Sequence, residues 1–436
     1  MNMDNAKKSS TPSLSEVFHD KKLFKREVIA GLTGYFAIMY VIFVNPEIVA
    51  VTGIPVRLET YATIFASAIG CLLAGFWAKS PMIIVPGMGI NALFSYTVKV
   101  DMGFSWETTL TIALISSVIF TIIAFSPLMD TIANSVTDSL KSAITAGIGA
   151  FLAFVALKNV QMIVPDKGSL VKFGNLLSTP VLLAILGIIL TLIFELKGFS
   201  WGMIGSMAII TIIALFLKVP GAASTPIKFS DLGAYGGQLF FHFGFGVPSW
   251  VKFITAIFAM LMLMVFEGVG ICKGMLPDQK QVKPTLQATG IANIAASMLG
   301  SSPSVDAAES GATMAAGGRT GVASITTGIL FIVSLVLVPV IAFIPTCATT
   351  SIIIWTACSM MSNIKMINMN DFSDWFPAFL IIIMIPFTGS IATGMAFGFI
   401  AYPIAKLAVG KQKELNVVNV TIAILFAISL VVTALI

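Results

Sequence analysis

Three carboxyl side chains interrupt apolar stretches of the sequence, and they are the residues best suited to chemistry. Glu267 lies in LMLMVFEGVGIC, and Glu309 lies in SVDAAESGATMAA with Asp306 three residues before it. A carboxyl group can accept two hydrogen bonds at once or carry a proton. The two glutamates are therefore candidate ligand-binding residues, and all three are candidate proton carriers. The alternatives are that the glutamates only tie helices together and that Asp306 only caps a helix.

The composition places these carboxyl groups in a membrane protein. Of the 436 residues, 57% are hydrophobic and 10% are charged, whereas about 25% of a soluble domain is charged. Many apolar runs are long enough to cross a hydrocarbon core of about 30 Å as a helix. A charged carboxylate at the centre of a bilayer costs about 2.5–3.5 kcal/mol, so such residues usually serve a function.

The sequence predicts an all-α polytopic fold of about fourteen transmembrane segments, numbered here in chain order: 28–49, 60–78, 82–98, 105–125, 141–157, 179–195, 200–217, 250–272, 284–300, 301–316, 320–344, 347–363, 374–388 and 390–408. Lysines and one arginine precede the first run, and most of the 25 Lys and Arg residues then fall on the same side of the membrane. This asymmetry predicts a cytoplasmic N-terminus. Residues 1–20 are polar and expected to be disordered, and stretch 416–436 fits either a further span or an interfacial helix.

Two segments are short and broken by proline and glycine. Segment 3 (82–98) contains Pro86 and segment 10 (301–316) contains Pro303, about half the chain length apart. Broken helices at matching positions of two halves indicate a transporter site between inverted repeats. Seven segments per half make the repeats inverted. In each we expect an extended stretch up to the proline and a half-helix just after it, with free backbone N–H groups at the helix start.

Polar and aromatic residues near the breaks complete the candidate site. The amide of Asn91 can donate and accept hydrogen bonds, or it can tie the broken backbone to a neighbouring helix. Thr313 lies four residues after Glu309 and so on the same helix face. A planar purine base offers adjacent N–H donors to a carboxylate and two faces for aromatic stacking. Further candidate residues are Ser304, Phe36, Tyr40, Phe94 and Phe266.

The sequence lacks the patterns of metal and cofactor sites. Its four cysteines are scattered singly, and neither of its two histidines lies in a predicted span. We therefore expect no metal, no cofactor and no nucleic-acid partner, and any proton coupling must use carboxyl groups. The glycines of AAGGRTG (315–321) fail the phosphate-loop spacing and are better suited to close helix packing, with Arg319 anchoring the end of segment 10.

Several longer strings resemble one transporter family. They are REVIAGLTGYFAIMYVIFVNPEI (26–48), PGMGINALFSYTV (86–98), AGIGAFLAFVALKN (146–159), ESGATMAAGGRTGVASITTGILF (309–331) and PAFLIIIMIPFTGSIATGMAFGFI (377–400). They are similar to the adenine/guanine/hypoxanthine permeases, a branch of the nucleobase–ascorbate transporter superfamily. The resemblance covers nearly the whole apolar region.

The resemblance implies a plasma-membrane importer of neutral purine bases that couples to protons. It also implies a homodimer in which a core domain moves like an elevator against a gate domain. The corresponding division is a tail (1–25), core (26–130 and 250–344), gate (139–218 and 346–410) and a C-terminal apolar segment (411–436).

The resemblance further implies that Asn91, Glu267 and Glu309 bind the substrate. Purine permeases usually carry a second aspartate one turn before the segment 8 carboxylate, where this chain has Met264. Uracil or xanthine thus stays an alternative substrate. Anion exchange on the same fold is disfavoured because two acidic residues would repel an anion. A membrane-embedded enzyme is disfavoured because no nucleophile–base or metal set is present.

Overall fold

The computed structural model describes residue 12, residues 14–166, 168, 170–199, 201–221, 231–341 and 343–435. Most of residues 1–20, which we expected to be disordered, lie outside these residues, but Leu14–His19 form the helix α1, so for them the expectation was wrong. The last residue of the 416–436 stretch is outside them as well.

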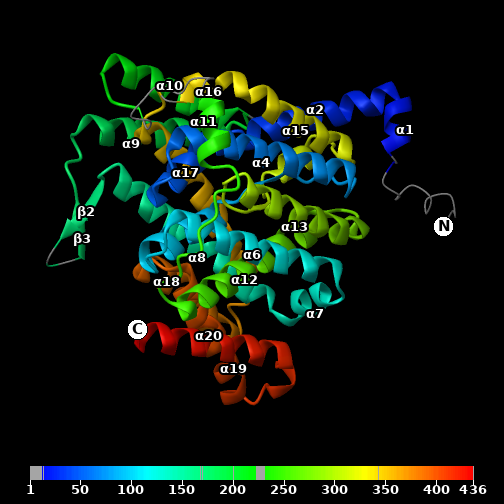
Figure 1. Cartoon of the computed structure of the whole chain (residues 1–436), viewed down its shortest axis with the longest axis vertical. Coiled ribbons are helices and arrows are strands. Elements are labelled where there is room, and N and C mark those ends of the chain that lie inside the picture. The colour runs from blue at the N-terminus through cyan, green and yellow to red at the C-terminus, as the bar shows by residue number, and fades with distance from the viewer. Residues whose placement is uncertain are drawn as a thin grey trace.

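The described chain is almost entirely helical (Figure 1). The first half contains α2 (Lys21–Ile38), α3 (Val41–Val49), α4 (Val56–Phe76), α5 (Met88–Ala92) with a π-helical continuation (Leu93–Asp101), α6 (Trp106–Phe125), α7 (Leu128–Ser135), α8 (Asp138–Asn159), α9 (Thr179–Leu196) and α10 (Gly202–Phe216). The second half contains α11 (Asp231–Gln238), α12 (Trp250–Met275), α13 (Val282–Met298), α14 (Ser310–Ala315), α15 (Gly321–Val333), α16 (Val338–Ile341), α17 (Thr346–Met361), α18 (Phe372–Thr388), α19 (Ile391–Ala408) and α20 (Val417–Leu435).

Eight helices within the described residues are long and apolar enough to cross a membrane, and shorter apolar helices accompany them. The predicted all-α polytopic class is confirmed. The number of membrane crossings stays a prediction, as does the topology of the C-terminal stretch. That stretch forms α20, whose Phe426 is 1% exposed and stacks on Phe399 of α19 with ring centroids 5.3 Å apart.

The two broken segments meet in a short antiparallel ladder at the centre of the fold. Strand β1 (Ile84–Pro86) pairs with β4 (Ser304–Asp306) in the register Pro86↔Ser304, Val85↔Val305 and Ile84↔Asp306. In a bilayer the interior of a helix pairs its own backbone groups, whereas a single extended stretch does not. Pairing β1 with β4 provides hydrogen-bond partners for the backbone groups of both extended stretches. The antiparallel direction of the pairing is consistent with two inverted repeats.

The half-helices differ in where they begin. α5 begins at Met88, two residues after Pro86, as the proline rule predicts. α14 begins only at Ser310, seven residues after Pro303. The expectation for segment 10 was wrong by about two turns, because residues 304–306 after the proline form β4 instead of a helix.

The helices pack as two groups. In the first, α4 packs on α13 and α15, α15 on α2, and α13 on α6. In the second, α8 packs on α17 and α18, α18 on α19, and α9 on α10 and α17. Fewer contacts join the groups, among them those of α8 with α12 and of α3 with α17.

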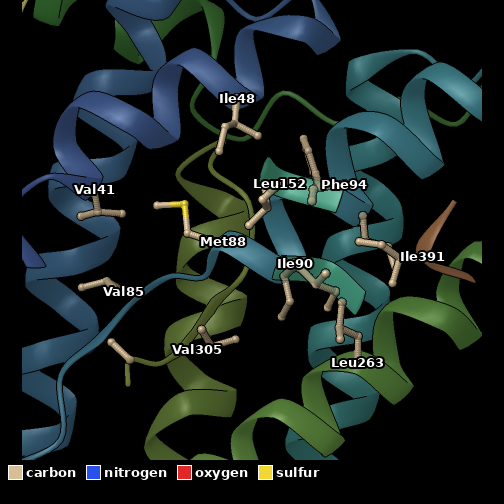
Figure 2. Packing of buried hydrophobic residues seen from close by; sticks show 14 of the residues in the cluster. Val41, Ile48, Val85, Met88, Ile90, Phe94, Leu152, Leu263, Val305 and Ile391 are labelled. Carbon is tan, nitrogen blue, oxygen red and sulfur yellow. The ribbon is translucent and has the colours of Figure 1, made fainter. Parts of the chain in front are cut away.

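Small residues allow close approach inside the first group. A Cβ added to Gly321 of α15 would lie 2.1 Å from the carbonyl oxygen of Gly75 on α4. This supports close packing as the role of this glycine in AAGGRTG. Side chains from β1, β4, the half-helix after β1 and the surrounding helices belong to one apolar cluster. Figure 2 shows Val85 and Val305 on the two extended stretches, with Leu263 and Ile391 on the side of Ile90.

A small hairpin lies away from the ladder. Strand β2 (Ile163–Asp166) pairs antiparallel with β3 (Leu170–Phe173) between α8 and α9. It was not predicted, because its residues lie between two apolar runs and carry no span signal.

Candidate functional site

A cavity of about 530 Å³ lies where the two broken segments face α12 and the second group of helices. Its volume falls in the usual range for small-molecule sites, about 300–1,000 Å³. Both ends of the β1–β4 region contribute to its lining, as do α8, α12 and α17. The predicted residues that line it are Tyr40, Phe266, Glu267, Asp306 and Glu309.

Glu267 of α12 lines the cavity, and its carboxyl group is positioned mainly by packing. Its Oε2 has no hydrogen-bond partner among the described residues. A Cβ added to Gly89 would lie 3.0 Å from Oε2 and 3.2 Å from Oε1. The missing side chain at Gly89 therefore makes room for the carboxyl group beside the start of α5.

Glu309 enters the cavity from the opposite broken segment and is held by a hydrogen bond. It occupies the N-cap position of α14. The hydroxyl of Tyr40, which is 1% exposed, donates to Glu309 Oε1 at 2.5 Å. Tyr40 thus contacts the carboxylate through its hydroxyl group, whereas the sequence suggested a stacking role.

Asp306 is the third acidic residue of the cavity lining that the sequence predicted. It ends β4, is fully buried, and its Oδ2 accepts a hydrogen bond from Thr289 Oγ1 of α13 at 3.0 Å. Its Oδ1 has no partner among the described residues. The alternative that Asp306 caps the half-helix is wrong, because Glu309 holds that position.

The start of the first half-helix adds backbone donors. Gly87, at the N-cap of α5, provides no side-chain hydrogen bond, and Gly87 and Met88 both line the cavity. The first N–H groups of a helix have no partner within it, and they carry a partial positive charge. These groups suit carbonyl oxygens or ring nitrogens of a polar ligand.

Five candidate residues lie outside the cavity lining. Asn91 accepts a hydrogen bond from Ser302 Oγ at 2.5 Å, so it ties one broken segment to the other. The remaining four are Phe36, which is 42% exposed on α2, and the fully buried Phe94, Ser304 and Thr313. Figure 2 shows Phe94 near Leu152, among apolar side chains.

The wall formed by α8 and α17 was not predicted. It contributes Ser142, Thr145, Thr356, Met360 and Asn363 to the cavity. These side chains are common in membrane helices, and their spacing alone gives no sign of a site. Gly89 was visible in the string GMGIN, but its packing against Glu267 depends on the fold.

The site therefore combines the carboxyl groups of Glu267 and Glu309, a helix start without a side-chain cap and an aromatic ring at Phe266. Phe266 is stacked on Phe399 of α19, with ring centroids 5.3 Å apart. Such a set can bind a small, flat, neutral molecule that presents N–H donors on one edge and acceptors on another. Within the described residues, no group of three or more His, Cys, Asp or Glu side chains could hold a metal ion.

Comparison with known proteins gives relatives over nearly the full length. The nucleobase transporter PlAzg2 of Paenibacillus larvae is 36% identical over 385 residues, covering 87% of this chain and 77% of the relative. The guanine/hypoxanthine permease PbuO of Bacillus subtilis is 32% identical, covering 95% and 99%. The adenine permease AdeQ of Escherichia coli is 29% identical, covering 99% of each chain.

Solved structures share the fold at low sequence identity. The transmembrane domain of the cyanobacterial bicarbonate transporter BicA superposes with a TM-score of 0.61 at 14% identity, covering 89% of this chain and 98% of that one. The murine anion transporter Slc26a9 in its inward-facing state gives a TM-score of 0.61 at 14% identity, covering 91% and 73%. These likenesses confirm the inverted-repeat transporter fold.

The model of the permease family (Xan_ur_permease) matches residues 25–397, which include every residue of the cavity described above. Together with the relatives, this match confirms the family expected from the sequence strings. The chain is a multi-pass membrane transporter of the permease family, within the nucleobase–ascorbate transporter group, and not an enzyme.

Proposed function

We propose that this permease carries a neutral purine nucleobase, such as guanine, hypoxanthine or adenine, across the membrane. The observation that carries the proposal is that Glu267 and Glu309 line one cavity between the two broken segments. The names of relatives that transport guanine, hypoxanthine or adenine support it.

The cavity chemistry favours a neutral base over an anion. Glu309 and Glu267 line the cavity, and their carboxyl groups are acceptors that can take adjacent N–H donors of a purine edge. The N–H groups at the start of α5 can donate to carbonyl or ring-nitrogen acceptors on the other edge. Phe266 offers a flat face. An anion would meet the carboxyl groups of Glu267, Asp306 and Glu309, whereas the two lysines of the lining already have partners, Asp138 for Lys141 and Asn134 for Lys273.

We further propose that import is coupled to protons. Glu267, Asp306 and Glu309 are buried or half-buried carboxyl groups around one cavity. Burial of an acidic group favours its neutral form, so a proton bound here can travel with the substrate. With Met264 buried and apolar where the branch carries aspartate, these three groups are the candidates for coupling.

We propose that the two helix groups are the core (26–130 and 250–344) and the gate (139–218 and 346–410) of an elevator. The limited contact between them supports this division. The cavity lies at their junction and extends to Lys273 and Lys141, on the side that the charge distribution predicts to be cytoplasmic. This structure is then an inward-facing state with the N-terminus inside, in a protein that works as a homodimer.

Uptake of radiolabelled guanine and hypoxanthine by cells that lack other purine transporters tests the proposal. Glu309→Gln should abolish uptake while the protein still reaches the membrane, because the carboxamide has one accepting oxygen and an NH2 donor where the carboxylate has two accepting oxygens. Glu195→Gln, in α9 and outside the cavity lining, is the matched control and should transport normally.

Two further arms separate the alternatives. Unlabelled adenine, guanine, hypoxanthine, xanthine, uracil and ascorbate should compete in proportion to their affinity, and displacement by uracil alone would overturn the purine assignment. A protonophore should collapse accumulation. Full accumulation in the presence of the protonophore would contradict proton coupling but not the transport of purines.

A further inference from the structure

A second polar cluster lies outside the cavity, where segments 1, 2 and 10 meet. Glu59 of α4 is 0% exposed and does not line the cavity. Three neutral donors converge on its Oε1: Asn45 Nδ2 at 3.1 Å, Thr63 Oγ1 at 3.3 Å and Ser301 Oγ at 2.7 Å. The sequence analysis did not single out this residue, because Glu59 stands just before an apolar run and not within one.

The buried carboxyl group has no counterion. Among the described residues no Lys, Arg or His forms an ion pair with Glu59, and the nearby Arg57 is paired with Asp231 at 3.1 Å. An isolated carboxylate buried away from water is unfavourable unless a cation or a proton compensates its charge. The cluster therefore needs one positive charge that none of the described residues supplies.

The unpaired atoms indicate which cation fits. Glu59 Oε2 and Asn45 Oδ1 are both buried acceptors without a partner among the described residues. A proton on Glu59 turns one acceptor into a donor. A metal ion fits less well, since the hydroxyl oxygens of Thr63 and Ser301 lie at hydrogen-bond distance from Oε1 and leave no gap between them.

We propose that Glu59, within its cluster with Asn45, Thr63 and Ser301, is a proton-binding site separate from the cavity, and that its proton is gained and lost during transport. This inference rests on the proposed proton coupling. It adds to that coupling a proton-binding residue, Glu59, that lies outside the cavity.

The cluster is connected to the cavity through the broken segment. Ser301 is followed by Ser302, which donates to Asn91 Oδ1 at 2.5 Å, and β4 then leads to Asp306 and Glu309. An ionised Glu59 binds the Ser301 hydroxyl more strongly than a neutral one does. Protonation thus changes how firmly the start of segment 10 is held.

Other charged groups around this part of α4 are few. Elements β1, α15 and the turn Ser334–Leu337 that pack on α4 carry none. Lys283 is exposed at the far end of α13 from Ser301. Besides Glu59, the titratable or charged groups on the packed elements and on α4 itself are Glu47, Arg57, Tyr61, Cys71, Asp231, Tyr235, Lys283 and Asp306.

Infrared difference spectroscopy on the purified protein in lipid membranes, without substrate, tests the site directly. Titration of the wild type should show the C=O band of a buried protonated carboxyl group, and Glu59→Gln should lose that band. Glu195→Gln should keep it, and Ser301→Ala should move it without removing it, since a hydrogen bond at the group is lost. A spectrum unchanged by Glu59→Gln would overturn the proposal.

Transport in proteoliposomes tests the coupling. Glu59→Gln resembles the protonated state, so it should keep substrate counterflow and lose accumulation driven by a pH gradient, whereas Glu195→Gln should keep both. Accumulation by Glu59→Gln at the wild-type level under the pH gradient would contradict a role of Glu59 in coupling. If the wild type itself ignores the pH gradient while the Glu59 band is present, proton symport fails and the proton site stands.

Discussion

The two cavity glutamates are held by different means, and this difference predicts different roles. One oxygen of Glu309 is held by the hydroxyl of Tyr40, and this also fixes the position of its other oxygen. Glu267 has an unpaired Oε2 and is held by packing against Gly89. A residue fixed before the ligand arrives loses little entropy on binding. Glu309 is therefore expected to set the orientation of the base.

The hydroxyl of Tyr40 is predicted to position Glu309. Tyr40→Phe removes one hydrogen bond to a carboxylate, worth about 1.5–3 kcal/mol, so the KM for guanine should rise about tenfold or more. Tyr35→Phe is the matched control, because Tyr35 lies on the same segment and its hydroxyl bonds Ser334 away from the cavity. Equal effects of the two changes on KM would contradict a positioning role for Tyr40.

Gly89 is predicted to be required for its lack of a side chain. In Gly89→Ala the new Cβ would crowd both oxygens of Glu267 and Ile148 Cδ1, at 3.0–3.2 Å. A misplacement of about 1 Å can cost roughly 100-fold in rate, so uptake should fall at least about tenfold with normal expression. Gly233→Ala in α11 is the control, because a Cβ there meets nothing within 4 Å and Gly233 lies outside the cavity lining. Normal uptake by Gly89→Ala would show that Glu267 has room to move.

The sequence correctly predicted those lining residues whose residue type is rare in an apolar segment. Glu267, Asp306 and Glu309 stand out because carboxyl groups are costly in apolar segments, and all three line the cavity. Phe36 and Phe94 were chosen from 33 phenylalanines, and the structure places neither in the lining. An abundant residue type gives no information on position without the fold.

At the scale of elements, the broken segments show what a pattern can and cannot specify. Proline and glycine predicted that segments 3 and 10 are broken, and they predicted the start of α5 correctly but not that of α14. They did not predict that β1 and β4 pair, because a ladder between residues 84–86 and 304–306 depends on contacts across half the chain. The late start of α14 follows from that pairing.

A second element-scale feature ties α18, α19 and the chain beyond α19 together. The ammonium of Lys406 is fully buried and lies 2.9 Å from Asp374, 3.3 Å from Asp371 and 2.6 Å from Glu414. Lys411 adds a contact of 2.5 Å to Asp371. The hydrogen bond from Lys411, followed by that from Ser373, lowers the pKa of Asp371 from its usual value.

This network predicts a pH-dependent contribution of Asp371 to stability. Because the folded-state pKa is lowered, the contribution is complete above the unfolded pKa of about 3.9 and is lost as pH falls through the folded value. Asp371→Asn should therefore lower the Tm in detergent near neutral pH, and the difference from wild type should shrink below about pH 4. A difference that stays constant on acidification would show that the charge of Asp371 does not cause it.

At the scale of the whole molecule, the two helix groups are joined by few polar bonds. The hydroxyl of Thr349 on α17 donates to Glu47 Oε2 of α3 at 2.5 Å. The backbone N–H of Ile391 at the start of α19 donates to Thr97 Oγ1 at 3.1 Å. If the core moves against the gate, these bonds must break and form in each cycle. The sequence predicted the two groups through family resemblance only, since neither bond leaves a local pattern.

Cross-linking the groups tests that movement. In a background whose four native cysteines are replaced, Glu47→Cys and Thr349→Cys place two thiols at a junction where the native side chains touch. A short thiol-specific cross-linker should reduce purine uptake to background, and release with a reductant should restore it. Each single cysteine variant, treated in the same way, should transport normally. Undiminished uptake by the fully cross-linked protein would mean that α3 and α17 stay together through the cycle, which an elevator with this division into core and gate does not allow.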